Sequence, residues 1–417
     1  MNAEKKLTIF ENVVWNTIGS LTYLICQWLL TLVVVRVSDD MTNAGNLSLA
    51  MSVTNIFYSL ACFQVRPYLV SDLNNHYKIN EYSVFRICTC VASTLMCAIY
   101  LCLYGYNRQQ FICIMIYMLY KVGEAWVDLL HAYEQRKSRM DIGGISLFVR
   151  GIISVVTFGV TLKYTDNLNL SITVMAVCTI GFIIVFDCPI SYKFEKYISK
   201  IELKRMLKML LEFFPLAIGS FMSTTAANLP RQILETKMGS EVLGIYSTVA
   251  TPAIIVQVAA TYVFNPVLTK LATLYNENKK KDFVRLIAKI SGVLVCISLV
   301  CICGAFVLGK WGLELLYGEK VKGHVYLLLP VIYYTCLNAF VMFFWNLLIV
   351  MRKLKLLLII GASGLLVCVS IMSGMISVYE MNGVSYTLII YSISLILIML
   401  GVIFNELYRK GKMPQQI

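Results

Sequence analysis

Four ionisable side chains recur at helical spacing inside one long apolar stretch, residues 111–134. Lys121, Glu124, Asp128 and His131 follow one another at steps of three, four and three residues. These steps place the four side chains along one face of an α-helix. Charges within a membrane-spanning helix are costly, so such a face turns toward a bundle interior or a water-filled cavity. The row is a candidate lining for a cleft that admits a polar substrate.

The residues alone leave two interpretations of this row open. In the structural one, Lys121 pairs with Glu124 and Asp128 and only neutralises their charge. In the functional one, Lys121 contacts an anionic substrate. At a rise of about 1.5 Å per residue, Lys121 lies about 20 Å from the C-terminal end of the stretch. It is therefore the charge nearest the middle of the membrane, and we prefer it as the cation that a substrate meets.

Arg150 is a second cation inside an apolar stretch, residues 143–162. It lies about seven residues from the start of that stretch, and Asp128 lies about six residues from the end of the preceding one. Both are then roughly 10 Å deep at about 1.5 Å per residue. Because consecutive membrane helices run in opposite directions, we expect Asp128 and Arg150 to form a buried ion pair.

A third polar group closes another apolar stretch, where Asn228 and Arg231 flank Pro230. Proline removes a backbone donor, so we expect the helix to end there beside a fixed positive charge. No Walker loop, glycine-rich dinucleotide turn or His-Glu-x-x-His motif occurs. We therefore expect no enzyme, no catalytic residue, no metal site and no cofactor, with energy supplied by an ion gradient such as H⁺ or Na⁺, by a partner or by the substrate. The candidate substrate-binding residues are Lys121, Glu124, Asp128, Arg150, Asn228 and Arg231.

The composition of the chain excludes a soluble domain. Of its 417 residues, 59% are hydrophobic and 14% are charged, whereas soluble domains are about 45–50% apolar and about 25% charged. Apolar runs of about 20 residues, the length that crosses a bilayer core, follow one another along the whole chain. The sequence predicts an all-α, polytopic membrane protein.

We expect twelve membrane helices in two six-helix lobes, 1–190 and 209–417, joined by a basic cytoplasmic linker, 191–208. A shift of about 200 residues aligns Ile18-Gly19-Ser20 with Ile218-Gly219-Ser220. A six-helix offset preserves orientation, so the lobes would be parallel repeats related by an axis along the membrane normal. The expected helices are residues 12–35, 44–64, 82–103, 111–134, 143–162, 168–186, 209–229, 243–268, 290–308, 325–350, 356–378 and 383–404.

The basic residues predict the orientation of these helices. Of the 36 Lys and Arg residues, 26 fall on one side of the predicted membrane and 8 on the other. Short cytoplasmic loops carry the excess of basic residues, so both termini are expected in the cytoplasm. The net charge of +13 is accounted for by this asymmetry and by contact with anionic membrane lipids. We expect no binding to nucleic acid.

Three stretches together resemble the polysaccharide-export family of the flippase superfamily that also contains the multidrug and toxin extruders. The first is 121–128, with Lys121, Glu124 and Asp128, followed by the basic turn 135–141. The second is Arg150 with the glycine after it. The third is 228–235, with a glycine at 239 and Leu243-Gly244 after it. The resemblance covers nearly the whole chain in length, helix count and two-lobe layout.

The resemblance implies a flippase of the bacterial cytoplasmic (inner) membrane. It would move undecaprenyl-diphosphate-linked oligosaccharide repeat units from the cytoplasmic to the outer leaflet by alternating access, for O-antigen or capsular polysaccharide assembly. A polysaccharide polymerase and a chain-length regulator are the protein partners it implies. A diphosphate and its sugars cannot cross hydrocarbon unescorted, so the cleft needs fixed cations and polar surface.

Two alternatives are open at this stage. A multidrug extruder of the same superfamily would use a carboxylate as a proton or sodium site and would need fewer cations in its cleft. A membrane polysaccharide polymerase is an enzyme and would carry a long external loop, whereas the external breaks here are short.

The predicted topology is testable by cysteine labelling. In intact cells, an impermeant thiol reagent should label Lys320→Cys and leave Lys200→Cys protected, because the basic linker is expected on the cytoplasmic side. The reverse pattern of labelling would overturn the orientation of every helix.

Overall fold

The computed structural model describes residues 8–38, 41–71, 76–194 and 202–408, and the regular structure in these ranges is helical. Ten segments there are long and apolar enough to cross a membrane. One of them, Lys280–Val350, contains two long helices. The charged helix that carries Lys121 is not among the ten. The chain is a multi-pass, all-α membrane protein, and the count of twelve crossings stays a prediction.

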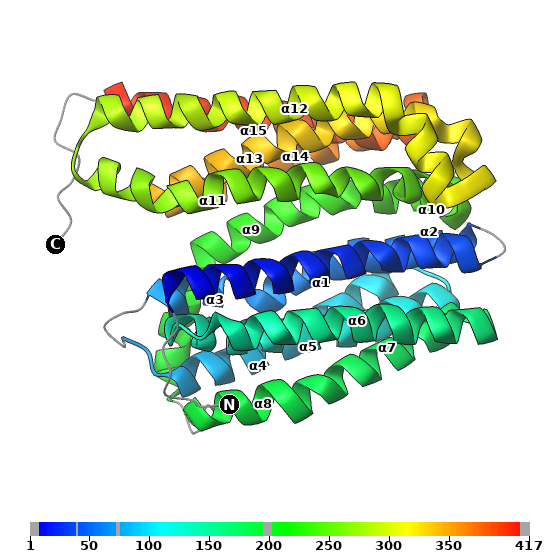
Figure 1. Ribbon diagram of the computed structural model, residues 1–417, viewed down its shortest axis with the longest axis horizontal. Helices are drawn as coiled ribbons and strands as arrows, with labels where there is room; N and C mark the ends of the chain where they lie inside the picture. Colours follow the sequence, from blue (N-terminus) through cyan, green and yellow to red (C-terminus); the bar gives the residue numbers. More distant parts are fainter. Residues whose placement is uncertain (1–7, 39–40, 72–75, 195–201, 409–417) are drawn as a thin grey trace. The chain divides into compact units, whose positions relative to one another are not determined.

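The helices form two compact units, Met1–Thr224 and Thr225–Ile417 (Figure 1). The first unit holds α1 (Ile9–Val37), α2 (Thr42–Cys62), α3 (Val65–Ser71), α4 (Ile79–Tyr104), α5 (Arg108–Arg136), α6 (Met140–Thr165), α7 (Leu168–Phe182), the π-helical turn η1 (Ile183–Asp187), α8 (Cys188–Phe194) and the first part of α9 (Leu203–Met238).

The second unit holds the rest of α9 and the helices after it. These are α10 (Ser240–Ala250), the 3₁₀ turn η2 (Thr251–Ala253), α11 (Ile254–Asn276), α12 (Lys280–Tyr317), the 3₁₀ segment η3 (Gly318–Leu327), α13 (Leu328–Val350), α14 (Leu354–Tyr379) and α15 (Met381–Tyr408). Helix α13 packs against α11, α12 and α15, and α14 packs along α15.

Helix α9 belongs to both units because its first half is anchored in the first one. The ring of Phe213 stacks on Tyr68 with centroids 4.1 Å apart, and the Tyr77 hydroxyl donates to Glu212 at 2.7 Å. Further along α9, Ser220 accepts from Gln64 at 2.9 Å. The units therefore divide at Thr224 inside α9. The sequence places the boundary in 191–208, of which residues 195–201 lie outside the described ranges.

Two helices continue past their predicted ends. The expected stop at Pro230 is wrong, because α9 runs on to Met238. A proline inside a helix costs one hydrogen bond without necessarily ending it. The stretch predicted to end at residue 186 continues as η1 and α8 to Phe194. As a result, Asp187 lies within a continuous run of helix rather than beyond the end of one.

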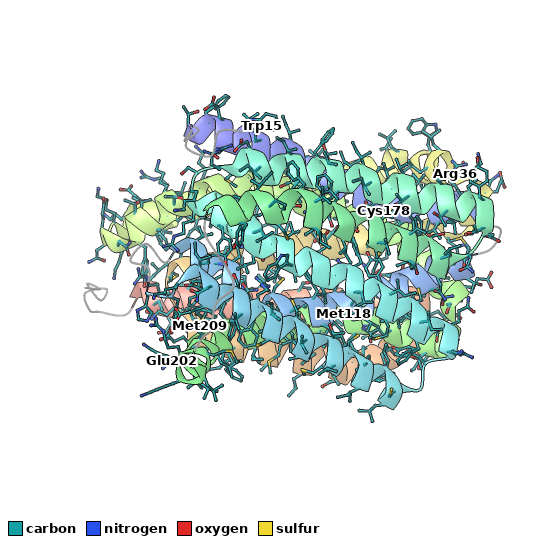
Figure 2. The ribbon with its side chains drawn as sticks, turned by 90° about the horizontal axis from the view of Figure 1, so that it is seen from below. Trp15, Arg36, Met118, Cys178, Glu202 and Met209 are labelled. Atoms are coloured by element: carbon teal, nitrogen blue, oxygen red, sulfur yellow. The ribbon has the colours of Figure 1, made fainter. Side chains whose placement is uncertain are left out.

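The outward faces of the helices are apolar, as lipid contact requires. Leu103, Val185 and Phe306 are each more than three-quarters exposed. By contrast, residues that face the interior are covered. Figure 2 marks one residue of each kind: Cys178 is exposed and Met118 is buried. Large apolar side chains without cover are expected where the solvent is hydrocarbon.

Helices α1 and α6 approach closely through glycine. A Cβ on Gly144 would overlap the carbonyl oxygen of Trp15, and a Cβ on Gly19 would overlap the backbone of Gly144. Small residues of this kind let membrane helices pack backbone to backbone. The α1–α6 contact places Tyr23 and Arg150 side by side, so it positions part of the polar interior of the unit.

Gly144→Ala should destabilise the protein by about 1–3 kcal/mol, because the added methyl group meets backbone that cannot rotate away. Gly181→Ala is the matched control, since nothing lies within 4 Å of its Cβ and alanine is the better helix former by about 1 kcal/mol. The midpoint of thermal denaturation in detergent checks this. Equal midpoints for the two variants would contradict the proposed packing.

Candidate functional site

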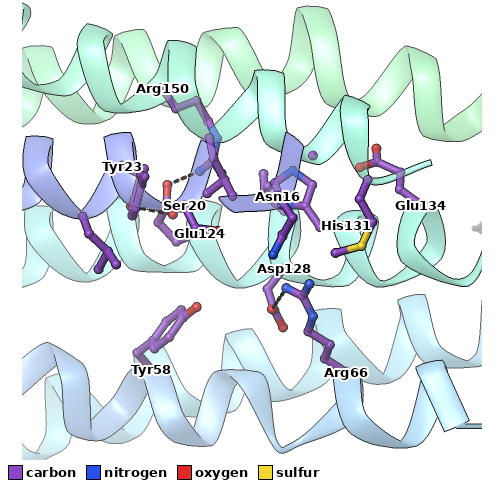
Figure 3. A pocket seen from close by; sticks show the side chains of 15 residues that line it. Asn16, Ser20, Tyr23, Tyr58, Arg66, Glu124, Asp128, His131, Glu134 and Arg150 are labelled. Carbon is purple, nitrogen blue, oxygen red and sulfur yellow. Dashed lines mark hydrogen bonds and ion pairs between the residues drawn. The ribbon is translucent and has the colours of Figure 1, made fainter. Parts of the chain in front are cut away.

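A cavity of about 380 Å³ lies inside the first unit, between α1, α2, α3, α5 and α6. Figure 3 shows that its polar lining is concentrated on α5, which contributes Glu124, Asp128, His131 and Glu134. The cavity therefore lies along the predicted row of ionisable residues. Arg66 and Arg150 are the two cations in its lining.

Glu124 and Arg150 form a buried ion pair at one end of the cavity. The Arg150 side chain is 1% exposed and also donates to Ser146 Oγ at 3.1 Å. The other carboxylate oxygen of Glu124 accepts from the Tyr23 hydroxyl at 2.7 Å, and the Arg150 guanidinium lies 5.5 Å from the Tyr23 ring centroid. Both charges of the pair are thus fully engaged by protein.

The predicted pairing of Asp128 with Arg150 is wrong, because Asp128 binds two other arginines. Arg66 Nη1 donates to it at 3.0 Å and Arg86 Nη2 at 3.2 Å. The depth of Arg150 in the membrane, estimated from the ends of the apolar stretches, is accurate only to within one helical turn. Glu124 lies one turn from Asp128, and in the packed structure it is the carboxylate next to Arg150.

Sequence reasoning missed Arg66 and Arg86, which were expected on the cytoplasmic surface. Phe63 and Gln64 take left-handed backbone conformations between α2 and α3, and α3 carries Arg66 back toward α5. Helix α4 starts at Ile79, so Arg86 lies two turns inside it and is 0% exposed. The early start of α4 is signalled by Glu81, whose side chain accepts from the Lys78 amide at 2.7 Å.

Lys121 is half-buried and has no carboxylate partner. Within the described ranges, no carboxylate oxygen lies within 4.0 Å of its Nζ, so the structural interpretation of the row fails for this residue. Its Nζ instead lies 5.2 Å from the ring centroid of Tyr58 and 5.7 Å from that of Tyr117. Aromatic faces attract a cation without neutralising it. Lys121 does not line the cavity itself.

Asn228 and Arg231 lie one turn apart on the part of α9 that belongs to the second unit. The Arg231 Nε atom is buried without a hydrogen-bond partner in the described residues. No carboxylate of those residues lies within 4.0 Å of its guanidinium. Its charge acts on the phenols of Tyr246 and Tyr334. The second unit therefore also holds a cation that its own acids do not neutralise.

The structure thus groups three of the six candidate residues in one cavity and separates the other three. The described residues contain no cluster of three or more His, Cys, Asp or Glu side chains that could hold a metal ion.

Comparison with solved structures identifies the fold of the chain. No protein-family model matches the chain. The MATE multidrug transporter DinF-BH, solved as a complex, superposes with a TM-score of 0.72 at 9% identity, covering 99% of this chain and 100% of that one. An inward-facing MATE family transporter of the MOP superfamily gives 0.71 at 11% identity, covering 98% and 100%. The chain has the fold of the MATE transporters.

One curated protein is similar to this chain in sequence. The chain is 24% identical over 315 residues to the capsular polysaccharide biosynthesis protein CapF of Staphylococcus aureus, covering 74% of this chain and 78% of that protein. The predicted all-α fold is confirmed by these structural neighbours.

The ion-pair assignment is testable with a double-mutant cycle. Glu124→Gln and Arg150→Met should each cost about 3–5 kcal/mol, because each leaves a buried charge unpaired. The double variant should recover part of this loss. Asp128→Asn combined with Arg150→Met should instead be nearly additive. A larger coupling between positions 128 and 150 than between 124 and 150, measured by thermal denaturation, would refute the assignment.

Proposed function

We propose that the protein is a flippase for a lipid-linked oligosaccharide that carries a diphosphate, the undecaprenyl-diphosphate repeat unit of O-antigen or capsule. In this proposal it works in the bacterial cytoplasmic membrane with both termini in the cytoplasm, and it moves the headgroup to the outer leaflet. The transporter fold supports movement of a substrate, and the similarity to a capsule-biosynthesis protein supports this substrate class.

The observation that carries the proposal is that Lys121 forms no ion pair within 4.0 Å among the described residues. The protein neutralises Glu124 and Asp128 with arginines but leaves this ammonium group to the faces of two tyrosines. An intramembrane cation without a counterion is costly. A diphosphate would supply the missing negative charge through charge-assisted hydrogen bonds.

The cavity of the first unit supplies groups suited to sugars. Its lining includes Asn16, Ser20, Tyr23 and Tyr58, which combine amide, hydroxyl and aromatic surface. Neutral groups of this kind bind sugar hydroxyls without requiring an ion pair. Tyr58 lines the cavity and also touches Lys121, so one side chain links the proposed sugar and phosphate contacts.

A multidrug extruder is the second candidate, favoured by the MATE neighbours. An extruder of cationic drugs needs a free carboxylate for its substrate. Here Glu124 and Asp128 are each bound to arginine, so neither is free to pair with a cationic drug. Lys121, one turn away on α5, favours an anionic substrate over a cationic one.

Lys121→Ala should be made and inserted at wild-type levels, because no ion pair is lost. Cells carrying it should accumulate lipid-linked oligosaccharide in the inner leaflet and lose surface polysaccharide. Lys121→Arg should retain part of the activity, since the charge is kept with altered geometry. Lys322→Ala is the matched control, because Lys322 is exposed and pairs with Glu319 at 3.3 Å. Surface polysaccharide and lipid-linked intermediates are the quantities to measure.

A wild-type amount of surface polysaccharide in a strain that expresses Lys121→Ala well would refute the proposal that Lys121 binds the diphosphate of a flippase substrate. Restored drug resistance in a pump-deficient strain, with surface polysaccharide unaffected by deletion of the gene, would favour the extruder instead.

A further inference from the structure

A second group of ionisable side chains lies beyond the Glu124 pair, where α5 meets η1. His131 and Glu134 come from α5 and are 7% and 1% exposed, and Asp187 ends η1 and is 0% exposed. The His131 Nε2 atom lies 3.5 Å from Asp187 Oδ1. We call these three residues the buried triad.

Most polar atoms of the buried triad have no hydrogen-bond partner. Glu134 Oε1 accepts from the Ser191 hydroxyl at 3.3 Å. Among the described residues, Glu134 Oε2, both carboxylate oxygens of Asp187 and Nε2 of His131 receive or donate no hydrogen bond. The His131 Nε2 and Asp187 Oδ1 atoms face each other at 3.5 Å, which leaves Glu134 Oε2 and Asp187 Oδ2 with no partner among the described residues. Buried polar atoms are normally paired, and a bound proton is one way to satisfy such atoms.

The cations around the buried triad are already engaged. The charged groups that act on it are Arg66 of α3, Arg139 of the α5–α6 turn, and Asp141 and Arg150 of α6. Helix α7 has no charged residue, and Ser191 is the contact from α8. Arg66 binds Asp128 and Arg150 binds Glu124.

Arg139 is held by Asp141 through two hydrogen bonds of 2.9 and 3.0 Å. The hydrogen bonds to the carboxylate raise the pKa of the Arg139 guanidinium, so Arg139 stays charged and bound to Asp141. Among the described side chains, the arginines that act on the two carboxyl groups are thus bound to other carboxylates, and His131 is the basic group paired with Asp187. Two buried carboxylates beside a neutral imidazole would leave two uncompensated charges, and protons are the simplest way to remove them.

The backbone is shaped around the triad. The π-helical turn Ile183–Asp187 interrupts the α7–α8 helix and ends at the buried aspartate, and such single π turns recur at functional sites. Opposite it, a Cβ on Gly143 would lie 3.1 Å from Glu134 Oε2 and 3.2 Å from His131 Cγ. Helix α6 therefore approaches the side chains of Glu134 and His131 closely.

The triad has a route to water on one side. His131 and Glu134 line the 380 Å³ cavity and Asp187 does not, and Figure 3 shows the first two side by side on α5 at one end of the cavity. A proton can pass between the cavity and the carboxyl group of Glu134 or the imidazole of His131 without crossing a helix.

We propose that His131, Glu134 and Asp187 form a proton-binding site whose occupancy controls how tightly η1 and α8 pack against α5. In the loaded state Glu134 is a neutral acid, with its O–H bond formed by a proton from cavity water, and a protonated His131 pairs with Asp187. Release returns the proton to the cavity water and leaves a net negative charge between α5 and η1. Repulsion between Glu134 and Asp187 then weakens the α5–η1 contact.

Hydrogen exchange of the purified protein in nanodiscs tests this site without a transport substrate, so its failure is distinguishable from failure of the flippase proposal. Protection of the amides in 183–194, corrected for intrinsic exchange, should fall by about tenfold per pH unit once the loaded triad begins to titrate, as expected if opening releases one proton. Glu134→Gln and Asp187→Asn each remove a titrating group and should abolish this pH dependence. Asp166→Asn is the control and should keep it, because Asp166 is an exposed acid at the opposite end of α6.

Infrared titration supplies a second readout that loss of folding would not imitate. The wild type should retain the carbonyl stretch of a protonated carboxylic acid well above about pH 4, where exposed acids have ionised. That band should be lost in Glu134→Gln and retained in Asp166→Asn. Protection that does not depend on pH in the wild type, an unchanged pH dependence in both isosteric variants, or the absence of the carboxylic acid band near neutral pH would each overturn the proposal.

Discussion

The first unit is organised by the cost of placing charge in a medium of low dielectric constant. Helix α5 carries Lys121, Glu124, Asp128 and His131 into the membrane, and each anion must meet a cation or take up a proton. The partners come from different helices: Arg150 from α6, Arg66 from α3 and Arg86 from α4. Neutralising the charges of α5 therefore also fixes how its neighbours surround it.

Two groups in the first unit carry charge that the neighbouring described side chains do not balance. Each of the two proposals is based on one of these groups. Lys121 is positive and touches aromatic rings instead of an acid. The buried triad carries acids in excess of its cations. In the flippase proposal, the substrate diphosphate balances the first, because Lys121 is only half-buried. In the second proposal, a proton from cavity water neutralises Glu134, which lines the cavity.

The fold and the site answer different questions about this protein. A backbone shared with MATE transporters at 9–11% identity shows the fold, but folds host many substrates. The pairing of Glu124 and Asp128 with arginines is a property of the site, and the proposed anionic substrate rests on it and on Lys121.

Features that depend on local pattern could be predicted from the chain alone. Apolar runs of membrane length indicated the all-α fold, and the spacing of Lys121, Glu124 and Asp128 placed them on one face of one helix, because helical periodicity needs no tertiary contact.

Features that depend on the distance between helices could not be predicted in this way. Arg150 pairs with Glu124 rather than Asp128, since a one-turn difference in depth cannot be read from run boundaries. Arg66 and Arg86 lie inside the unit, because a left-handed turn and an early helix start redirected them. Asp187 is buried, because a π turn keeps in the bundle a residue that the sequence places at the start of a loop.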